Sequence, residues 1–214
     1  MRSRTLPLLL ALAATTLTSP LPQQKTGLTA ASILEISPST SSCANSPAAG
    51  ECRTAHQAGP FINISFTNFG IRDFPTQAAL LSLILYESGA FKYSKNHFPG
   101  VPGQGTRNMQ SPEFNLEYAT WLATVCANCG ISEVEVRRAE GEGVEAVLGL
   151  VNGDEWGLGS AAWFWSTQCD PTVKQGLREG TQEGWEAYLS QCVGTTATEE
   201  RTAIWRKAMA LGSW

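Results

Sequence analysis

One carboxylate at the end of an apolar segment is the residue in this sequence best suited to chemistry. Glu87 follows residues 78–85, a run of Ala, Leu and Ile interrupted by one Ser, and it precedes Ser88 and Gly89. A carboxyl group at the end of such a helix is partly desolvated, and desolvation penalises its charged form. Glycoside hydrolysis requires one protonated carboxyl group beside the leaving oxygen. Glu87 is therefore the candidate general acid, suited to neutral or mildly acidic pH.

The loop that follows carries a second informative segment, residues 105–112, which ends in Met109-Gln110-Ser111-Pro112. Together, Glu87-Ser88, Phe91 and Met109-Gln110 resemble the lysozyme-like superfamily, especially goose-type lysozymes and soluble lytic transglycosylases. There, a Glu-Ser pair ends a buried helix and a Gly-Leu-Met-Gln segment lines the sugar cleft. Arg107-Asn108 stands here in place of the usual Gly-Leu.

Two further segments resemble known secreted proteins. Residues 160–165, which end in Trp163-Phe164-Trp165, are similar to the buried Trp-Phe-Trp helix of plant-type, lysozyme-like chitinases. With the first likeness, this match covers about forty residues. Residues 96–100 also resemble a group of secreted fungal proteins. We expect the three aromatic residues to lie in the core rather than in a cleft.

The resemblance implies roles for individual residues. Glu87 would protonate the glycosidic oxygen, Gln110 would bind an N-acetyl group or a sugar hydroxyl, and Met109 would pack beneath the sugar. A loop-bracing role for the Gln110 amide is the alternative. The candidate substrate-binding residues are Ser88, Tyr93, Asn96, Asn108, Met109 and Gln110.

The sequence does not assign a second catalytic carboxylate. An inverting glycosidase needs a carboxylate base with room for water, whereas a transglycosylase can use a hydroxyl of its own substrate. His97 is a possible base, but without a placed partner we expect it to be a loop hydrogen-bonding residue. The available acidic residues are Asp73, Glu113, Glu117 and Asp154.

The N-terminus predicts export. Arg2 and Arg4 precede a short apolar run, the pattern of a secretory signal peptide, which we place at residues 1–19. Residues 20–42 are rich in Ser, Thr, Pro and Gln and are expected to be a flexible leader or propeptide. One lysozyme-like domain would then occupy residues 43–214. Asn63-Ile64-Ser65 is a glycosylation sequon, consistent with a secreted, extracellular glycoprotein.

The cysteine count supports an oxidising compartment. Six cysteines permit fifteen pairings, of which the local pairs Cys43–Cys52 and Cys169–Cys192 are the simplest. This choice leaves Cys126 with Cys129, a spacing that is awkward within a regular helix. A structural disulfide is favoured there over a redox or zinc site. A redox motif would stand at a helix start beside a βαβ unit, and a zinc site would need four clustered ligands, and the sequence predicts neither arrangement. No cofactor or metal is expected.

The predicted fold is mainly α, disulfide-stabilised and lysozyme-like, with at most a small β-sheet. A buried helix is expected from Asp73 to Ser88 because Pro75 and an N-cap precede an all-apolar segment. The best strand candidate is residues 61–66, and a long loop is expected over 93–112. Further helices are expected near 113–126, 132–149, 158–168, 171–179, 182–192 and 198–210, with stops at Gly149, Gly180 and Gly194.

The net charge of the chain excludes some classes of binding partner. The chain has 15 basic and 19 acidic residues, and removal of Arg2 and Arg4 leaves 13 and 19, a net charge of −6. This excess of acidic residues argues against nucleic acid as a partner and against electrostatic attraction to anionic surfaces. The resemblance to the lysozyme-like superfamily implies a hydrolase of the muramidase type, which we expect to be a monomer that cleaves an N-acetylglucosamine-containing cell-wall polymer. Peptidoglycan is preferred to chitin because Glu87-Ser88 and Met109-Gln110 are more similar to the lytic enzymes. The alternatives are a chitinase-like hydrolase and a non-catalytic saccharide-binding or effector protein.

Overall fold

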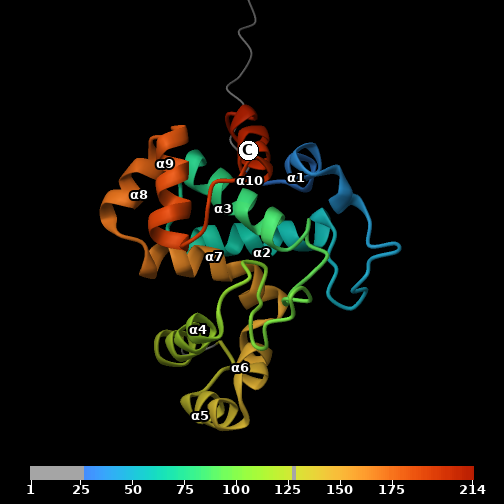
Figure 1. The fold of residues 1–214 in the computed structure, drawn as a ribbon, viewed down its shortest axis with the longest axis vertical. Coiled ribbons are helices and arrows are strands. Elements are labelled where there is room, and N and C mark those ends of the chain that lie inside the picture. The colour runs from blue at the N-terminus through green and yellow to red at the C-terminus, as the bar shows by residue number, and fades with distance from the viewer. Residues whose placement is uncertain (1–26, 127–128) are drawn as a thin grey trace, which may run out of the picture.

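Ten α-helices account for most of the described residues, 27–126 and 129–214, in the computed structural model (Figure 1). Within this part of the chain, β structure is limited to two isolated bridges, Lys95 with Gly105 and Gly105 with Gln110. The predicted α class is confirmed. The α-helices are α1 (Ala30–Ile36), α2 (Ala55–Asn68), α3 (Phe74–Glu87), α4 (Pro112–Val125), α5 (Glu133–Glu142), α6 (Val144–Val151), α7 (Asp154–Gln168), α8 (Pro171–Arg178), α9 (Gln182–Ala187) and α10 (Glu199–Ala210).

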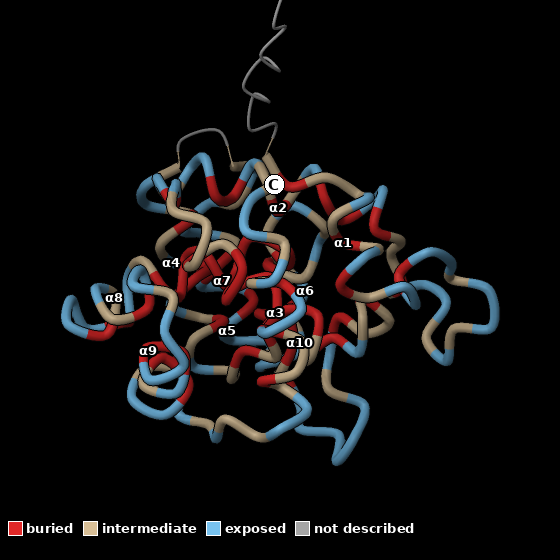
Figure 2. Tube along the Cα trace, turned by 90° about the horizontal axis from the view of Figure 1, so that it is seen from above, coloured by how far each residue is buried: buried red, intermediate tan, exposed pale blue. Residues whose placement is uncertain are grey.

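Helix α3 lies at the centre of the molecule, as the sequence predicts. Asp73 caps it by accepting a hydrogen bond from the Thr76 amide at 2.9 Å, and Pro75 occupies the first turn. Every residue from 78 to 85 is buried, because α10, α8 and α7 all pack against this helix. Figure 2 shows the buried chain concentrated around α3 and α7. The apolar surface of α3 therefore fixes where Glu87 emerges.

The prediction of a strand at residues 61–66 is wrong, because these residues lie within α2. Thr54 and Gln57 form a capping box that starts the helix. Its buried residues include Ala55, Ala58, Ile62 and Phe66, a spacing of three and four that places them on one helical face against α7. Six residues are too short to separate this period from strand alternation.

The ordered domain begins before Cys43. Ile33 and Ile36 of α1 are buried in the main core, and a short 3₁₀-helix, η1, follows at Pro38–Ser41. The expectation of a flexible leader is therefore wrong for residues 27–42. The signal peptide and residues 20–26 lie outside the described residues.

The glycosylation sequon lies within α2 rather than in a loop. The Asn63 Oδ1 accepts a hydrogen bond from the Leu28 amide at 3.1 Å, and its Nδ2 donates to the Leu28 carbonyl. These contacts tie the N-terminal segment to α2. Glycosylation of Asn63 stays a prediction.

Helices α4, α5 and α6 form a smaller group on one side of α7 (Figure 1). The helix expected over 132–149 is divided at Gly143, whose φ of +111° favours glycine, and Gly149 lies inside α6. Gly180 and Gly194 each follow the end of a helix, as expected, and both have a positive φ. Trp163 and Phe164 belong to the core of this group, whereas Trp165 belongs to the main core.

All three predicted disulfides are present: Cys43–Cys52, Cys126–Cys129 and Cys169–Cys192. Cys126 stands just after the end of α4, which removes the difficulty of bridging this spacing inside a regular helix. Cys169–Cys192 joins the end of α7 to a π-helical segment, η2 (Tyr188–Val193), which continues α9. None of the helices in the described residues has the length and apolar character needed to cross a membrane.

Candidate functional site

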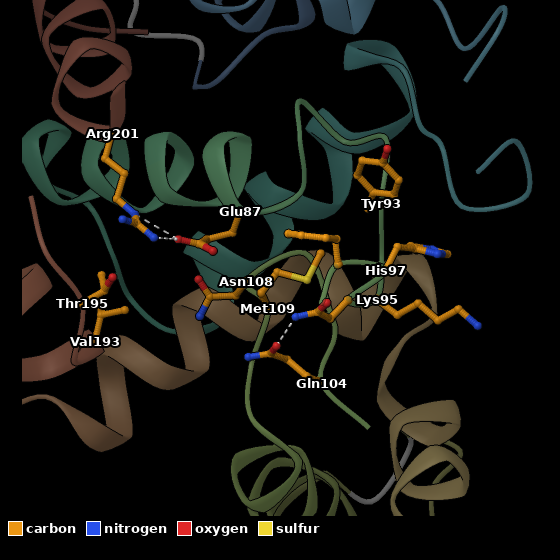
Figure 3. Close-up of a pocket in the computed structure, with 12 residues that line it drawn as sticks. Glu87, Tyr93, Lys95, His97, Gln104, Asn108, Met109, Val193, Thr195 and Arg201 are labelled. Carbon is orange, nitrogen blue, oxygen red and sulfur yellow. Dashed lines mark hydrogen bonds and ion pairs between the residues drawn. The ribbon is translucent and has the colours of Figure 1, made fainter. Parts of the chain in front are cut away.

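A cleft of about 490 Å³ lies at the C-terminal end of α3 (Figure 3). Two regions far apart in sequence form it, the loop after α3 and the segment from the end of η2 to the start of α10. Its lining residues are Glu87, Tyr93, Lys95, Asn96, His97, Phe98, Gln104, Asn108, Met109, Val193, Thr195 and Arg201. Five of the seven residues expected at the site therefore share one cleft.

Glu87 is held by an arginine from α10. The Nε and Nη2 atoms of Arg201 donate to the same oxygen, Glu87 Oε1, at 3.1 and 3.0 Å. The two side chains are mostly buried, with 19% and 15% of their surfaces exposed. Among the described residues, Oε2 of Glu87 has no hydrogen-bond partner. The carboxylate thus offers one fixed oxygen and one free oxygen in the cleft.

Arg201 changes the interpretation of Glu87. Its guanidinium is a counterion that the sequence did not assign, and its charge-assisted hydrogen bonds hold the carboxylate in place. Arg201 also packs over the Tyr86 ring, with 4.4 Å between its Cζ and the ring centroid. Sequence reasoning missed this residue because it lies 114 positions from Glu87, in a helix that only the fold brings near.

Ser88 and Gln110 do not line the cleft, so their expected substrate contacts are corrected. Ser88 is buried: its Oγ donates to the Ile84 carbonyl at 2.6 Å and accepts from the Phe91 amide at 2.9 Å. The Gln110 side chain is also buried and donates to Asn115 Oδ1 at 3.1 Å. Both residues brace the loop, which was the alternative for Gln110.

Asn96 and Asn108 bring side-chain amides to the cleft. Asn96 donates to the Gln104 side chain and accepts from the Gly100 amide at 3.0 Å, so it also shapes the loop. Asn108 lies below Glu87 in Figure 3, beside Met109, and its Oδ1 has no hydrogen-bond partner within the described residues. Met109 has a positive φ of 48°, a sharp turn that presents its side chain to the cleft.

Arg107 explains the departure from Gly-Leu. Its buried guanidinium donates to the Phe91 and Tyr93 carbonyls at 3.0 and 2.9 Å and to the Glu51 carbonyl. Burial lowers the pKa of Arg107 to about 10, opposed by the charge of Asp154, whose Oδ1 lies 3.9 Å from Nη2. One side chain thus joins the segment around Glu51 to the loop after α3, and it is structural.

His97 has a carboxylate partner, Glu51, which the sequence did not assign. Its Nε2 lies 2.8 Å from Glu51 Oε1, and Glu51 Oε2 accepts from the Ser94 amide at 2.7 Å. Burial acts to raise the pKa of Glu51, but hydrogen bonds from Ser94, His97 and the Lys95 amide outweigh it and lower the pKa. His97 therefore anchors the loop, as expected. It occupies the end of the cleft opposite Arg201 (Figure 3).

None of the four other acidic candidates lines the cleft. Asp73 caps the opposite end of α3, and Asp154 pairs with Arg53 at 2.6 Å. Glu117 accepts from Gln168, and Glu113 lies in the first turn of α4. Glu87 is the one carboxylate among the lining residues of the described structure. The described part of the chain also contains no group of three or more His, Cys, Asp or Glu residues placed to hold a metal ion.

Comparison with known proteins yields one informative match. No family model matches the chain, and no solved structure matches it. The chain is 38% identical over 157 residues to a bifunctional dioxygenase (DOX)-epoxy alcohol synthase (EAS) of Fusarium oxysporum (strain Fo5176). The match covers 73% of this chain and 12% of that protein. Because the chain spans so small a share of its relative, the similarity relates it to one segment of that protein and does not carry over the named activity.

Proposed function

We propose that the protein is an extracellular glycoside hydrolase that cleaves an N-acetylglucosamine-containing cell-wall polymer, with Glu87 as proton donor. The observation that carries this proposal is a carboxylate with one free oxygen in a cleft lined by amide and aromatic side chains. Amides of Asn96, Gln104 and Asn108 match the hydroxyl and acetamido groups of sugars. Rings such as Tyr93 can pack on the apolar faces of pyranoses. Three disulfides support an oxidising compartment.

In this mechanism the proton that Glu87 donates is carried on Oε2, the oxygen that is not bonded to Arg201. The proton passes to the glycosidic oxygen while the bond from that oxygen to the anomeric carbon breaks. Arg201 then stabilises the negative charge that develops on Glu87, an interaction stronger after proton transfer than before it. Because no second carboxylate lines the described cleft, the acetamido oxygen of the substrate is the proposed nucleophile at the anomeric carbon. Water then attacks that carbon and loses a proton to Glu87, so that the acetamido group and the protonated Glu87 are both restored.

A non-catalytic saccharide-binding protein, such as a secreted effector, is the second candidate. The Glu87–Arg201 ion pair favours it, because a carboxylate held by an arginine is a good hydrogen-bond acceptor for sugar hydroxyls. Under this alternative, the same cleft would hold a cell-wall oligosaccharide without turnover.

Incubation with isolated peptidoglycan and with colloidal chitin tests the proposal and separates the two polymers. The wild-type protein should release soluble fragments from at least one of them, peptidoglycan first, and Glu87→Gln should not. Glu186→Gln changes an exposed glutamate outside the cleft and is the matched control. Saccharide binding without release over long incubation would decide for the second candidate.

A further inference from the structure

The outer end of the cleft carries two side chains whose placement the fold does not explain. Phe98 leaves 92% of its surface exposed although it lines the cleft. Lys95 is exposed, and its ammonium group has no hydrogen bond or ion pair within the described residues; Figure 3 shows it extending away from Arg201. An apolar ring and a long cation that contact so little protein add little to the stability of the fold.

The loop that presents these two side chains is firmly held. The Asn96 amide donates to the Gln104 carbonyl at 2.9 Å, and Lys95 pairs with Gly105 in an isolated bridge. The Glu51–His97 contact fixes the loop on its other side. Phe98 and Lys95 therefore project from a supported loop, which lowers the entropic cost of ordering them around a ligand.

The charge of the lining residues is opposite in sign to that of the chain. The carboxylate of Glu87 is paired with Arg201, and Lys95 adds a positive charge without a partner among the described residues. The full chain has a net charge of −4. Such a local positive charge attracts an anionic group, and the attraction weakens with salt.

We infer that Lys95 and Phe98 form an outer subsite for a carboxylate-bearing sugar. The Lys95 ammonium would contact the carboxylate while the Phe98 ring packs on the apolar face of the sugar. This inference rests on the proposed function and makes it more specific: the preferred polymer carries carboxylates along its glycan chain, as the lactyl groups of peptidoglycan do where no peptide is attached to them. Neutral chitin offers no partner for Lys95.

Binding measurements on the Glu87→Gln protein test this subsite without cleavage. The probes are chitopentaose and a peptide-free peptidoglycan glycan chain of similar length, compared by calorimetry at low and high salt. We expect the anionic chain to bind about three- to fivefold more tightly at low salt, the range of an exposed ion pair, and the advantage to vanish at high salt. Lys95→Gln should abolish the advantage without changing the affinity for chitopentaose. Phe98→Ala should weaken both ligands about fivefold or more.

The matched control is Lys92→Gln, because the Lys92 ammonium contacts the Ser39 and Ser42 carbonyls outside the cleft. Equal affinity for the two probes, or a preference that survives in Lys95→Gln, would overturn the subsite while leaving a saccharide-binding cleft intact. Binding of neither probe would overturn both the subsite and the proposed function. Full hydrolytic activity in Glu87→Gln, with the binding preference intact, would contradict only the catalytic role of Glu87.

Discussion

Arg201 donates from two nitrogens to one carboxylate oxygen of Glu87, at 3.1 and 3.0 Å, and so joins the start of α10 to the end of α3. The contact occurs where the two helices pack along each other. It leaves the second oxygen of Glu87 available to a ligand. The same ion pair therefore belongs both to the lining of the cleft and to the packing of α10 on α3.

Arg201→Met should destabilise the protein. The substitution leaves a mostly buried carboxylate without its partner, and we expect the free energy of unfolding to fall by about 1–3 kcal/mol. Urea denaturation followed by circular dichroism measures this change. Arg206→Met, which removes an exposed pair with Glu199 on the same helix, should change it by less than about 1 kcal/mol. Equal losses in the two variants would show that the Glu87–Arg201 pair stabilises the fold no more than an exposed ion pair does.

Arg107→Lys should also be destabilising, although the charge is conserved. A guanidinium reaches the Phe91, Tyr93 and Glu51 carbonyls together, whereas an ammonium lacks that planar arrangement of donors. We expect a loss of about 1–3 kcal/mol in the same denaturation measurement. The control is Arg137→Lys on the exposed face of α5, expected within about 0.5 kcal/mol of wild type. A wild-type midpoint for Arg107→Lys would refute the proposed bracing role.

Glu51 should make stability depend on pH in a defined direction. Its pKa in the folded protein is lowered, so its contribution is present above the unfolded value and is lost as pH falls through the folded value. Glu51→Gln should therefore cost more stability at about pH 7 than at about pH 3, because the advantage of the charged form is lost as wild-type Glu51 becomes protonated. Urea titrations of both proteins at the two pH values measure the difference. The same cost at both would contradict the assigned hydrogen bonds.

The disulfides should contribute unequally to the free energy of unfolding. Cys169 and Cys192 are 23 residues apart, so loop closure predicts a loss of about 3 kcal/mol when both are replaced by Ala. Cys126 and Cys129 are 3 apart, and the same relation gives about 1.5 kcal/mol. Thermal unfolding of the two double variants compares the losses. A larger loss for the pair at 126 and 129 would show that native-state contacts outweigh loop closure.

Local sequence signals were sufficient for the disulfides and for most of the helices from residue 73 onward. The cap at Asp73 and the apolar run to Leu85 act within one segment, so α3 could be predicted without knowledge of its neighbours. The prediction of a strand at residues 61–66 failed because the strand and helix patterns of apolar residues cannot be told apart over six residues. Ile33 and Ile36 lie next to polar, leader-like sequence, and only their partners in the core identify them as buried.

The site was predicted less completely than the fold. Glu87 and the loop around Met109 are close enough in sequence to be associated, and both line the cleft. Whether a loop side chain points into a cleft or back into the protein depends on backbone turns, which is why Ser88 and Gln110 were misplaced. Arg201 and Glu51 act across long sequence separations, and no local motif marks either of them.

The most direct test of Glu87 as a proton donor is the release of soluble fragments from purified peptidoglycan at mildly acidic pH, followed over time by chromatography and mass spectrometry. Wild-type protein is predicted to release fragments steadily. Glu87→Gln should bind the same material and release none above the background of a protein-free control. Equal release by the two proteins would contradict the assignment of Glu87 as the proton donor.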